Sequence, residues 1–470
     1  MSDKEQAEDF GKSRSTKTMA SYGFGKFLFE FVTGAFAAIV FKFYETNMEL
    51  DPLVTALGII IYSIWNAVND PLIGWFTTRP TKYAKKHGRR YPWIVLGLFL
   101  WPVSFIAIFL VPESLKGNQL PVFLWMILST CLYDTFGSLW EVNYQSVFPD
   151  KFRKKKDRDK AAGIATIIGV FGIALGFLVH SQIIDYEDKS SFVINGVIYA
   201  VIAFVISFLM LPGVKEDKGM IRRYLDFVER EKDIEVPSFK DQLRKAFKQR
   251  NFLAFILLYL FYQAATMSMT SSIHYVGDYI LPEDASDTTI IFAGMLVGAL
   301  LSVPLWLKLS RKYKDNQKLL TVAAFAMAAF TFPMTFVNSQ IGFTISLLIF
   351  GVSFGGFWLI MTPAMADVID EIVVQEKERR DGVYLGFRAF FGRLAYAAQA
   401  ISFGVVHELT GFVNVAGAEQ TEFAKLGIHL HMATIPAIFL IIGGLLFMKL
   451  NTLNKKKMDI IHRELAELNL

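Results

Sequence analysis

A carboxylate and two amides interrupt a long apolar stretch of the chain between residues 53 and 76. Asp70 lies in this stretch, and Asn66 and Asn69 come four residues and one residue before it. In an α-helix, Asn66 and Asp70 would lie one above the other on the same face. A carboxylate in hydrocarbon costs several kcal/mol unless it has a partner, so it indicates a functional site. The pattern predicts a cation-coupled transporter rather than a membrane anchor.

A second carboxylate lies at a matching depth in another apolar stretch. At 1.5 Å per residue, Asp70 and Glu141 are each about 10 Å from one end of their stretches. Two carboxylates with amide and hydroxyl oxygens form a site suited to Na⁺; alternatively, two close carboxylates share a proton. The predicted cation site consists of five residues, namely Asp70, Asn66, Asn69, Ser138 and Glu141.

Four more side chains are candidates for binding a substrate together with Glu141. Glu30 lies roughly 13 Å into its stretch, near the midplane, and Asp134 lies about 10 Å further out than Glu141 on the same face. Arg393, also near the midplane, needs a carboxylate, a polar substrate or water. It would donate to a substrate or lock two halves together through a carboxylate. Trp358 would stack on a sugar ring, or it would simply pack or contact lipid.

These residues need membrane-spanning helices to position them. Of the 470 residues, 53% are hydrophobic, and about twelve apolar segments reach the roughly 20 residues that cross a bilayer. The predicted fold is all-α and integral to the membrane, with two six-helix bundles. The predicted spans are 20–45, 53–77, 92–111, 119–148, 160–184, 192–213, 251–281, 286–309, 318–336, 341–370, 383–410 and 424–450.

The loops alternate between basic and acidic composition, which sets the orientation. Lys and Arg gather in every second loop, so the positive-inside rule predicts that both termini are cytoplasmic. The predicted divisions are an N-terminal tail (1–19), a first bundle (20–213), a central loop (214–250), a second bundle (251–450) and a C-terminal tail (451–470). Within the central loop, the segment from Phe239 to Phe252 is either an amphipathic helix on the membrane surface or a solvated linker.

The sequence also disfavours several functions. It contains no phosphate-binding loop, nucleophile elbow or metal-ligand spacing, so an enzyme and a bound cofactor are not expected. Charged residues concentrate in the loops, so the chain has no compact basic domain that would bind nucleic acid. We expect a monomer surrounded by membrane lipids. Two acidic–basic pairs flank the predicted cytoplasmic turns, where they would gate or brace that face: Asp150 with Arg153, and Asp367 with Arg380.

Several motifs carry a family resemblance over most of the chain. They are Ser21-Tyr22-Gly23-Phe24-Gly25, Trp65 to Trp75 around Asn69-Asp70-Pro71, Gly88 to Trp93, Phe357-Trp358, Met365 to Asp370, and Arg379-Arg380-Asp381-Gly382. With these motifs the chain resembles the glycoside–pentoside–hexuronide:cation symporters of the major facilitator superfamily, the melibiose permease-like proteins.

The resemblance implies a role for each candidate residue. Asp70 would be a cation ligand beside Asn69, Glu30 would bind sugar hydroxyls, and Glu141 would serve both sugar and cation. Trp358 would stack on the sugar, and Arg393 stands where the family has a coupling lysine. This chain departs from the pattern at Asn66, where melibiose permease has a second aspartate, and at both sugar-site aspartates, which are glutamates here.

The expected function is therefore Na⁺- or H⁺-coupled symport of a sugar, a glycoside or a related polar solute across the cell membrane by alternating access. The same branch of the superfamily includes lysophospholipid transporters, so a lipid substrate is the first alternative. A membrane receptor or scaffold that does not transport is the second.

Overall fold

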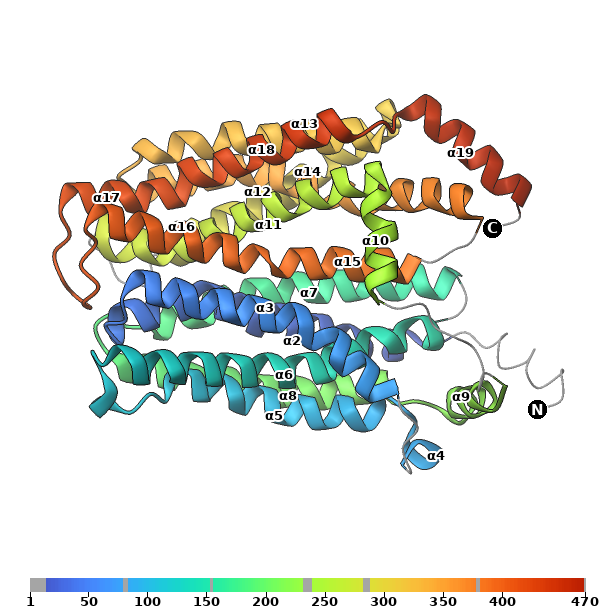
Figure 1. Ribbon diagram of the computed structural model, residues 1–470, viewed down its shortest axis with the longest axis horizontal. Coiled ribbons are helices and arrows are strands. Elements are labelled where there is room, and N and C mark those ends of the chain that lie inside the picture. The colour runs from blue at the N-terminus through green and yellow to red at the C-terminus, as the bar shows by residue number, and fades with distance from the viewer. Residues whose placement is uncertain are drawn as a thin grey trace. The chain divides into compact units, whose positions relative to one another are not determined.

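Helices make up all the regular structure among the residues that the computed structural model describes, which are 14–78, 83–152, 155–230, 239–281, 288–377 and 381–468 (Figure 1). Twelve helical segments of this part of the chain are long and apolar enough to cross a membrane. The predicted all-helical fold with about twelve spans is confirmed.

The helices follow one another along the chain with short connections. The first part of the chain contains α2 (Thr16–Lys42), η1 (Phe43–Asn47), α3 (Pro52–Thr78), α4 (Ala84–His87), α5 (Tyr91–Phe109), η2 (Glu113–Leu115), α6 (Gln119–Lys151), α7 (Lys155–Ile183), α8 (Lys189–Val214) and α9 (Lys218–Arg230). The second part contains α10 (Phe239–Lys248), α11 (Arg250–Tyr275), η3 (Val276–Ile280), α12 (Thr288–Tyr313), α13 (Asn316–Thr331), η5 (Phe332–Phe336), α14 (Gln340–Glu376), α15 (Asp381–Arg393), α16 (Ala395–Thr410), α17 (Glu422–His429), η6 (Leu430–Thr434), α18 (Ile435–Leu450) and α19 (Lys455–Leu468).

Contacts between the helices divide the chain into two compact units. Unit 1 consists of Met1–Leu50 and Ile64–Glu235, and unit 2 consists of Asp51–Ser63 and Val236–Leu470. The start of α3 therefore packs with the second unit, while its end, which carries Asp70, belongs to the first. All five predicted cation ligands belong to unit 1.

Small residues allow two helices of unit 2 to pack closely. A side chain on Gly298 of α12 would meet the backbone carbonyl of Leu348 in α14, and one on Gly351 of α14 would meet the carbonyl of Met295 in α12. Between helices in lipid, close backbone approach replaces the hydrophobic effect as a source of association, because lipid tails are as apolar as the side chains. The α12–α14 pair depends on these glycines for that reason.

The first membrane span of each unit ends in a short π-helix. α2 continues into η1 in unit 1, and α11 continues into η3 in unit 2. Single π-helical turns are rare and recur at functional positions. A π-helical turn thus ends the first membrane span of each unit.

Some predicted boundaries differ from the structure. The predicted eleventh span is one membrane-crossing segment, Tyr384–Thr410, in which the single residue Leu394 separates α15 from α16 while keeping helical dihedral angles. The predicted central loop contains α9 and α10, and the predicted C-terminal tail forms α19. The amphipathic helix predicted for Phe239 to Phe252 ends at Lys248, because Gln249 separates it from the span α11.

A buried carboxylate from the α8–α9 connection caps the beginning of α5. Glu216 is 8% exposed, and its Oε2 accepts hydrogen bonds from the backbone N–H of Arg90 (2.8 Å) and Tyr91 (3.0 Å). The first N–H groups of a helix lack intrahelical partners, and the helix dipole favours negative charge there. Gly88 has φ +88° and lies so close to Glu216 that a Cβ would overlap the carboxylate. The Gly88-to-Trp93 motif thus has a structural cause.

Replacing Glu216 by alanine should lower the stability of the protein. The change leaves two partly buried N–H groups without their acceptor and removes a charge that favours the helix dipole, which together contribute about 1–3 kcal/mol. Thermal unfolding of the detergent-purified protein would measure it. Glu113→Ala is the control, because Glu113 is an exposed partner of Lys189 and such pairs contribute little. Equal effects of the two substitutions would show that Glu216 is no cap.

Candidate functional site

Helices α3 and α6 meet through a buried polar pair in unit 1. Asn69 is 3% exposed and Asp134 is 6% exposed, and Nδ2 of Asn69 donates a hydrogen bond of 2.9 Å to Oδ2 of Asp134. The carboxylate of Asp134 thereby gains a partner in the hydrocarbon region, where an unpartnered charge would be costly. The bond uses the amide nitrogen of Asn69, so its Oδ1 oxygen is the atom that could ligate a cation.

Glu141 lies two turns further along α6 and is also buried. Its Oε1 accepts a hydrogen bond of 2.7 Å from Nε2 of Gln145. The charges that act on Glu141 include the ammonium of Lys26 and the carboxylates of Asp134 and Glu30. Three of the acidic residues predicted from the sequence therefore belong to one electrostatic neighbourhood. The direct pairing of Asp70 with Glu141 stays a prediction.

Lys26 is the residue that sequence reasoning missed. It lies in α2 four residues before Glu30, and its Nζ is 2.6 Å from Oε1 of Glu30. Residues four apart on a helix face the same side, so this spacing predicts the ion pair. This ion pair contributes more to stability than one on a water-exposed helix would, because α2 is part of a membrane-spanning segment. It gives unit 1 a cation and an anion side by side.

The two predicted substrate residues of the second half belong to unit 2. Trp358 in α14 is 38% exposed and stacks on Phe354, with ring centroids 5.9 Å apart. Arg393 lies where α15 ends, in the electrostatic environment of Tyr62 and Tyr396. The roles of Trp358 and Arg393 in binding stay predictions.

Arg388 lies five residues before Arg393 in α15. Its guanidinium lies over the ring of Tyr259, 5.5 Å from the centroid. A guanidinium above an aromatic face is stabilised by the ring quadrupole. Arg388 thus packs against α11 within unit 2.

The predicted gating residues have partners that the sequence did not indicate. Asp150 pairs with Arg90, and Oδ2 of Asp367 accepts hydrogen bonds from Asn316 (3.0 Å) and Gln317 (3.4 Å) at the start of α13. Both aspartates brace helix ends within their own units. Arg153 and Arg380, their predicted partners, lie outside the described residues.

The predicted cation ligands of unit 1 carry only oxygen donors. Within the described parts of the chain, no group of three or more His, Cys, Asp or Glu side chains is placed to hold a metal ion. Asp70, Asn66, Asn69, Ser138 and Glu141 offer carboxylate, amide and hydroxyl oxygens, which are the ligands that hard cations prefer. These residues fit Na⁺ better than a transition metal.

Comparison with known proteins identifies relatives across nearly the whole chain. The model of the family described as "MFS/sugar transport protein" matches residues 21–454. Sodium-dependent lysophosphatidylcholine symporter 1 of Gallus gallus is 23% identical over 459 residues, which cover 90% of this chain and 84% of that protein. The symporter of the same name from Mus musculus is 21% identical, covering 91% of this chain and 84% of its own. Sphingosine-1-phosphate transporter MFSD2B of Xenopus tropicalis is 20% identical, covering 88% and 83%.

Solved structures of transporters share the fold. A bacterial homologue of the human lysosomal transporter Spinster aligns with a TM-score of 0.64 at 12% identity, covering 97% of this chain and 99% of that one. A D-xylose-proton symporter aligns with a TM-score of 0.62 at 14% identity, covering 92% and 97%. The similarities place the chain among membrane transporters rather than enzymes.

Replacing Asn69 by alanine should destabilise the α3–α6 contact by about 1–3 kcal/mol, because the buried carboxylate of Asp134 loses its donor. Combining Asn69→Ala with Asp134→Ala should cost less than the sum of the two, since the double variant leaves no unpaired group. Thermal unfolding of the four proteins measures the coupling.

Asn143→Ala provides the matched control for this cycle. Asn143 is also a buried amide, but it donates to the backbone carbonyl of Leu139 in its own helix. Its substitution should add to Asp134→Ala without coupling. Additive effects for Asn69 and Asp134 would contradict the pairing.

Proposed function

Since the chain belongs to the MFS/sugar transport protein family, we propose that this membrane transporter carries a lysophospholipid, of the lysophosphatidylcholine class, together with Na⁺. The main support for this proposal is the similarity of the chain to lysophosphatidylcholine symporters. Proteins named sodium-dependent lysophosphatidylcholine symporters match 85–91% of the chain. They support the lipid alternative over the sugar that the melibiose permease-like motifs suggest, and they support Na⁺ over H⁺.

The charges of unit 1 agree with a zwitterionic substrate. A lysophosphatidylcholine head group has a phosphate and a quaternary ammonium. The Lys26–Glu30 pair offers a complementary cation and anion 2.6 Å apart, and Glu141 extends the acidic side. A sugar would need hydrogen-bonding groups but no such pair. In this proposal Lys26 receives the phosphate, while Glu30, Asp134 and Glu141 provide the acidic surroundings for the ammonium.

Na⁺ would bind beside this group. Asp70 supplies the negative charge, and Asn66, Asn69, Ser138 and Glu141 supply further oxygens. This chain has one fewer aspartate here than melibiose permease, and Na⁺ would offset one of the two negative charges of Asp70 and Glu141. Binding of Na⁺ would lower the cost of the carboxylates in hydrocarbon, which gives the ion a reason to be coupled to the substrate.

We further propose the general features of the transport cycle. Two six-helix bundles would alternate access to a substrate at the cell membrane, with both termini in the cytoplasm. Arg393 would donate to the phosphate, since guanidinium groups bind phosphate oxygens in a bidentate manner. Trp358 would pack along the substrate. Asp150 and Asp367 would stabilise the ends of helices as the bundles move.

Proteoliposome uptake tests the proposal. Radiolabelled oleoyl-lysophosphatidylcholine is offered on albumin, and lipid that remains outside is then extracted with albumin. An inward Na⁺ gradient should increase uptake over a K⁺ gradient. Asp70→Asn should abolish that increase. Lys26→Gln should raise the KM up to about tenfold, because a hydrogen bond to a charged group contributes roughly 1.5 kcal/mol or less when the side chain is 42% exposed.

Glu187→Gln is the matched control, since it removes one carboxylate from an exposed connection, and it should transport normally. Na⁺-driven uptake of a galactoside in the same vesicles, without uptake of lysolipid, would contradict the lipid proposal and restore the sugar. Binding of lysolipid without any uptake would favour a receptor.

A further inference from the structure

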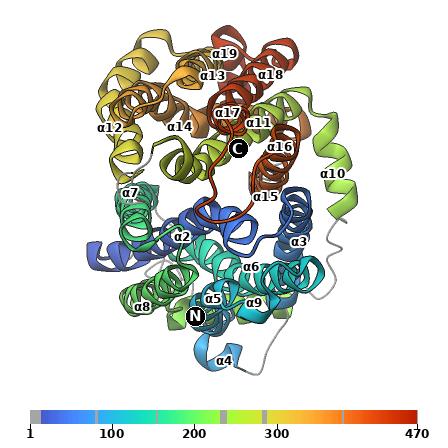
Figure 2. The same ribbon diagram turned by 90° about the vertical axis from the view of Figure 1, so that its left-hand side faces the viewer.

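Helix α10 has an orientation that a membrane-spanning helix does not have. It runs across α11 and α15 rather than alongside them (Figure 1), and Figure 2 shows it at the periphery of unit 2. It ends at Lys248, and the span α11 begins at Arg250. An amphipathic helix that lies in the plane of a bilayer surface crosses the neighbouring spans in this way.

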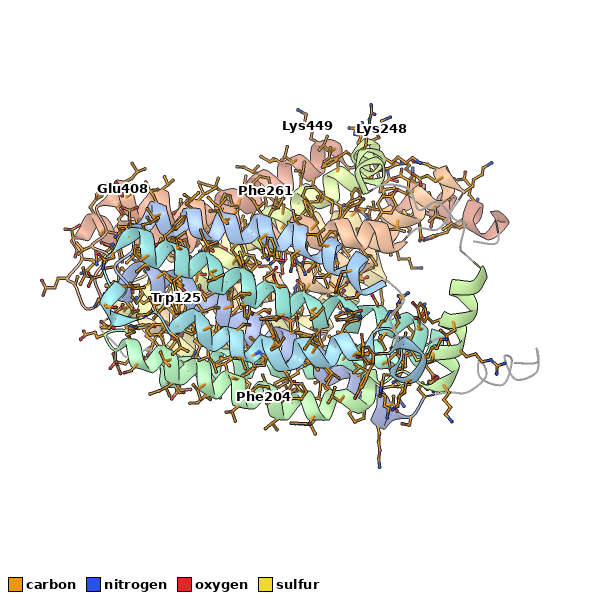
Figure 3. The ribbon with its side chains drawn as sticks, turned by 60° about the horizontal axis from the view of Figure 1, so that its bottom comes forward. Trp125, Phe204, Lys248, Phe261, Glu408 and Lys449 are labelled. Carbon is orange, nitrogen blue, oxygen red and sulfur yellow. The ribbon has the colours of Figure 1, made fainter. Side chains whose placement is uncertain are left out.

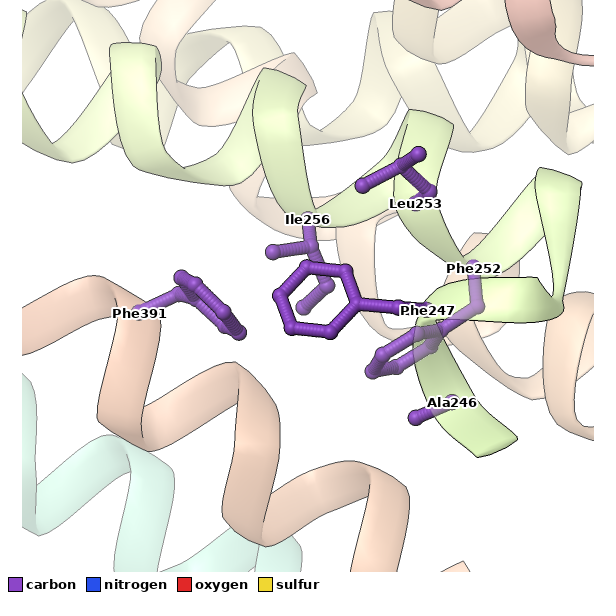
Figure 4. A pocket seen from close by; sticks show the side chains of 6 residues that line it. All are labelled: Ala246, Phe247, Phe252, Leu253, Ile256 and Phe391. Carbon is purple, nitrogen blue, oxygen red and sulfur yellow. The ribbon is translucent and has the colours of Figure 1, made fainter. Parts of the chain in front are cut away.

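An apolar hollow lies between α10 and the spans beside it. The hollow is shallow and open to the surface, and it is lined by Ala246, Phe247, Phe252, Leu253, Ile256 and Phe391 (Figure 4). Phe252 and Ile256 are almost fully buried, whereas Phe247 is 45% exposed and packs edge-on against Phe391, with centroids 5.6 Å apart. A lining made only of hydrocarbon favours an alkyl chain over water.

The hollow lies at the depth where lipid head groups give way to acyl chains. Ile256 comes six residues after Arg250, or about 9 Å along the helix. The segment Arg250–Ile280 is a membrane-spanning candidate, so Arg250 marks its polar end. Interfacial helices bury their apolar faces about 5–10 Å into this boundary.

Basic side chains gather beside the hollow. Residues 239–250 include five basic residues and one acidic residue, and Lys245 and Lys248 are exposed. Arg250 donates to the backbone carbonyls of Leu450 (2.8 Å) and Lys449 (3.0 Å), which brings the end of α18 to the same place. Figure 3 shows Lys248 and Lys449 at one edge of the unit.

We propose that this surface binds an anionic phospholipid of the adjoining leaflet. One acyl chain lies along the surface of the hollow against the exposed Phe247, and the phosphate lies against Lys245 and Lys248. The lipid holds α10 on the membrane at the start of α11. The site differs from that of the transported lysolipid, and the proposal does not depend on the identity of that substrate.

Thermal unfolding of the full chain in detergent, with added lipid, tests the proposal. Dioleoyl phosphatidylglycerol should raise the Tm more than dioleoyl phosphatidylcholine, which has the same chains. Lys245→Glu with Lys248→Glu should raise the phosphatidylglycerol concentration needed for a half-maximal Tm shift by roughly 30-fold or more. Each basic residue near an anionic surface contributes about a fivefold factor in affinity. Phe247→Ser should weaken the response to both lipids.

Lys455→Glu with Lys456→Glu is the matched control, because these two exposed lysines begin α19 of the same unit. The control should respond as the wild type does. The proposal is wrong if the control loses as much of the phosphatidylglycerol-induced Tm shift as the Lys245/Lys248 variant does. It is also wrong if the Lys245/Lys248 variant keeps the full Tm shift. An equal shift with glycerol 3-phosphate would identify a soluble phosphate site instead and would also overturn it.

Two further measurements separate this proposal from others. If the charge-reversed variant does not fold, Lys245→Gln with Lys248→Gln replaces it, with the same expected order. Lysophosphatidylcholine should stabilise the wild type and the variant equally, since it binds the transport site. A missing response to lysophosphatidylcholine in both proteins would count against the proposed substrate and leave the anionic lipid site standing.

Discussion

The structure depends on one constraint: a charged side chain within a membrane-spanning helix must have a partner. Unit 1 meets it with short-range pairs on adjacent turns or adjacent helices, namely Lys26 with Glu30, Asn69 with Asp134, and Gln145 with Glu141. In each pair, the partner lowers the free-energy cost of placing the carboxylate in hydrocarbon. A soluble protein would leave such groups to water.

The other features of the structure hold the helices that carry these pairs in place. Backbone groups in lipid must be satisfied within each helix, which explains why the described chain is helical throughout its spans. Glycines bring α12 and α14 into backbone contact, and Glu216 fixes the beginning of α5 near the basic connection that precedes it. Leu394 separates α15 from α16 and places Arg393 at a helix end. The close packing of α12 on α14 and the irregular residue Leu394 thus lie at different places in the fold.

Most of the fold could be predicted from sequence because membrane spans need a length and a composition that few other elements have. The twelve spans follow from that rule, although the interruption at Leu394 does not, since no proline or glycine marks the residue itself. Asp70, Asp134 and Glu141 could be identified because isolated carboxylates in apolar runs are conspicuous. Lys26 was missed because a lysine near a span end is easily taken for one that reaches the interface, and its pairing appears only from the spacing to Glu30. For α10 the sequence left two alternatives open, since amphipathic periodicity alone does not distinguish a membrane-bound helix from a solvated one.

Substrate-dependent movement of ²²Na⁺ into proteoliposomes tests the central claim most directly. If the buried carboxylates bind Na⁺ in order to carry a zwitterionic lipid, adding lysophosphatidylcholine should accelerate ²²Na⁺ influx in the wild type and leave the Asp70→Asn variant at the rate of empty vesicles. Lysophosphatidylcholine uptake that proceeds at the full rate with no accompanying ²²Na⁺ would contradict the account.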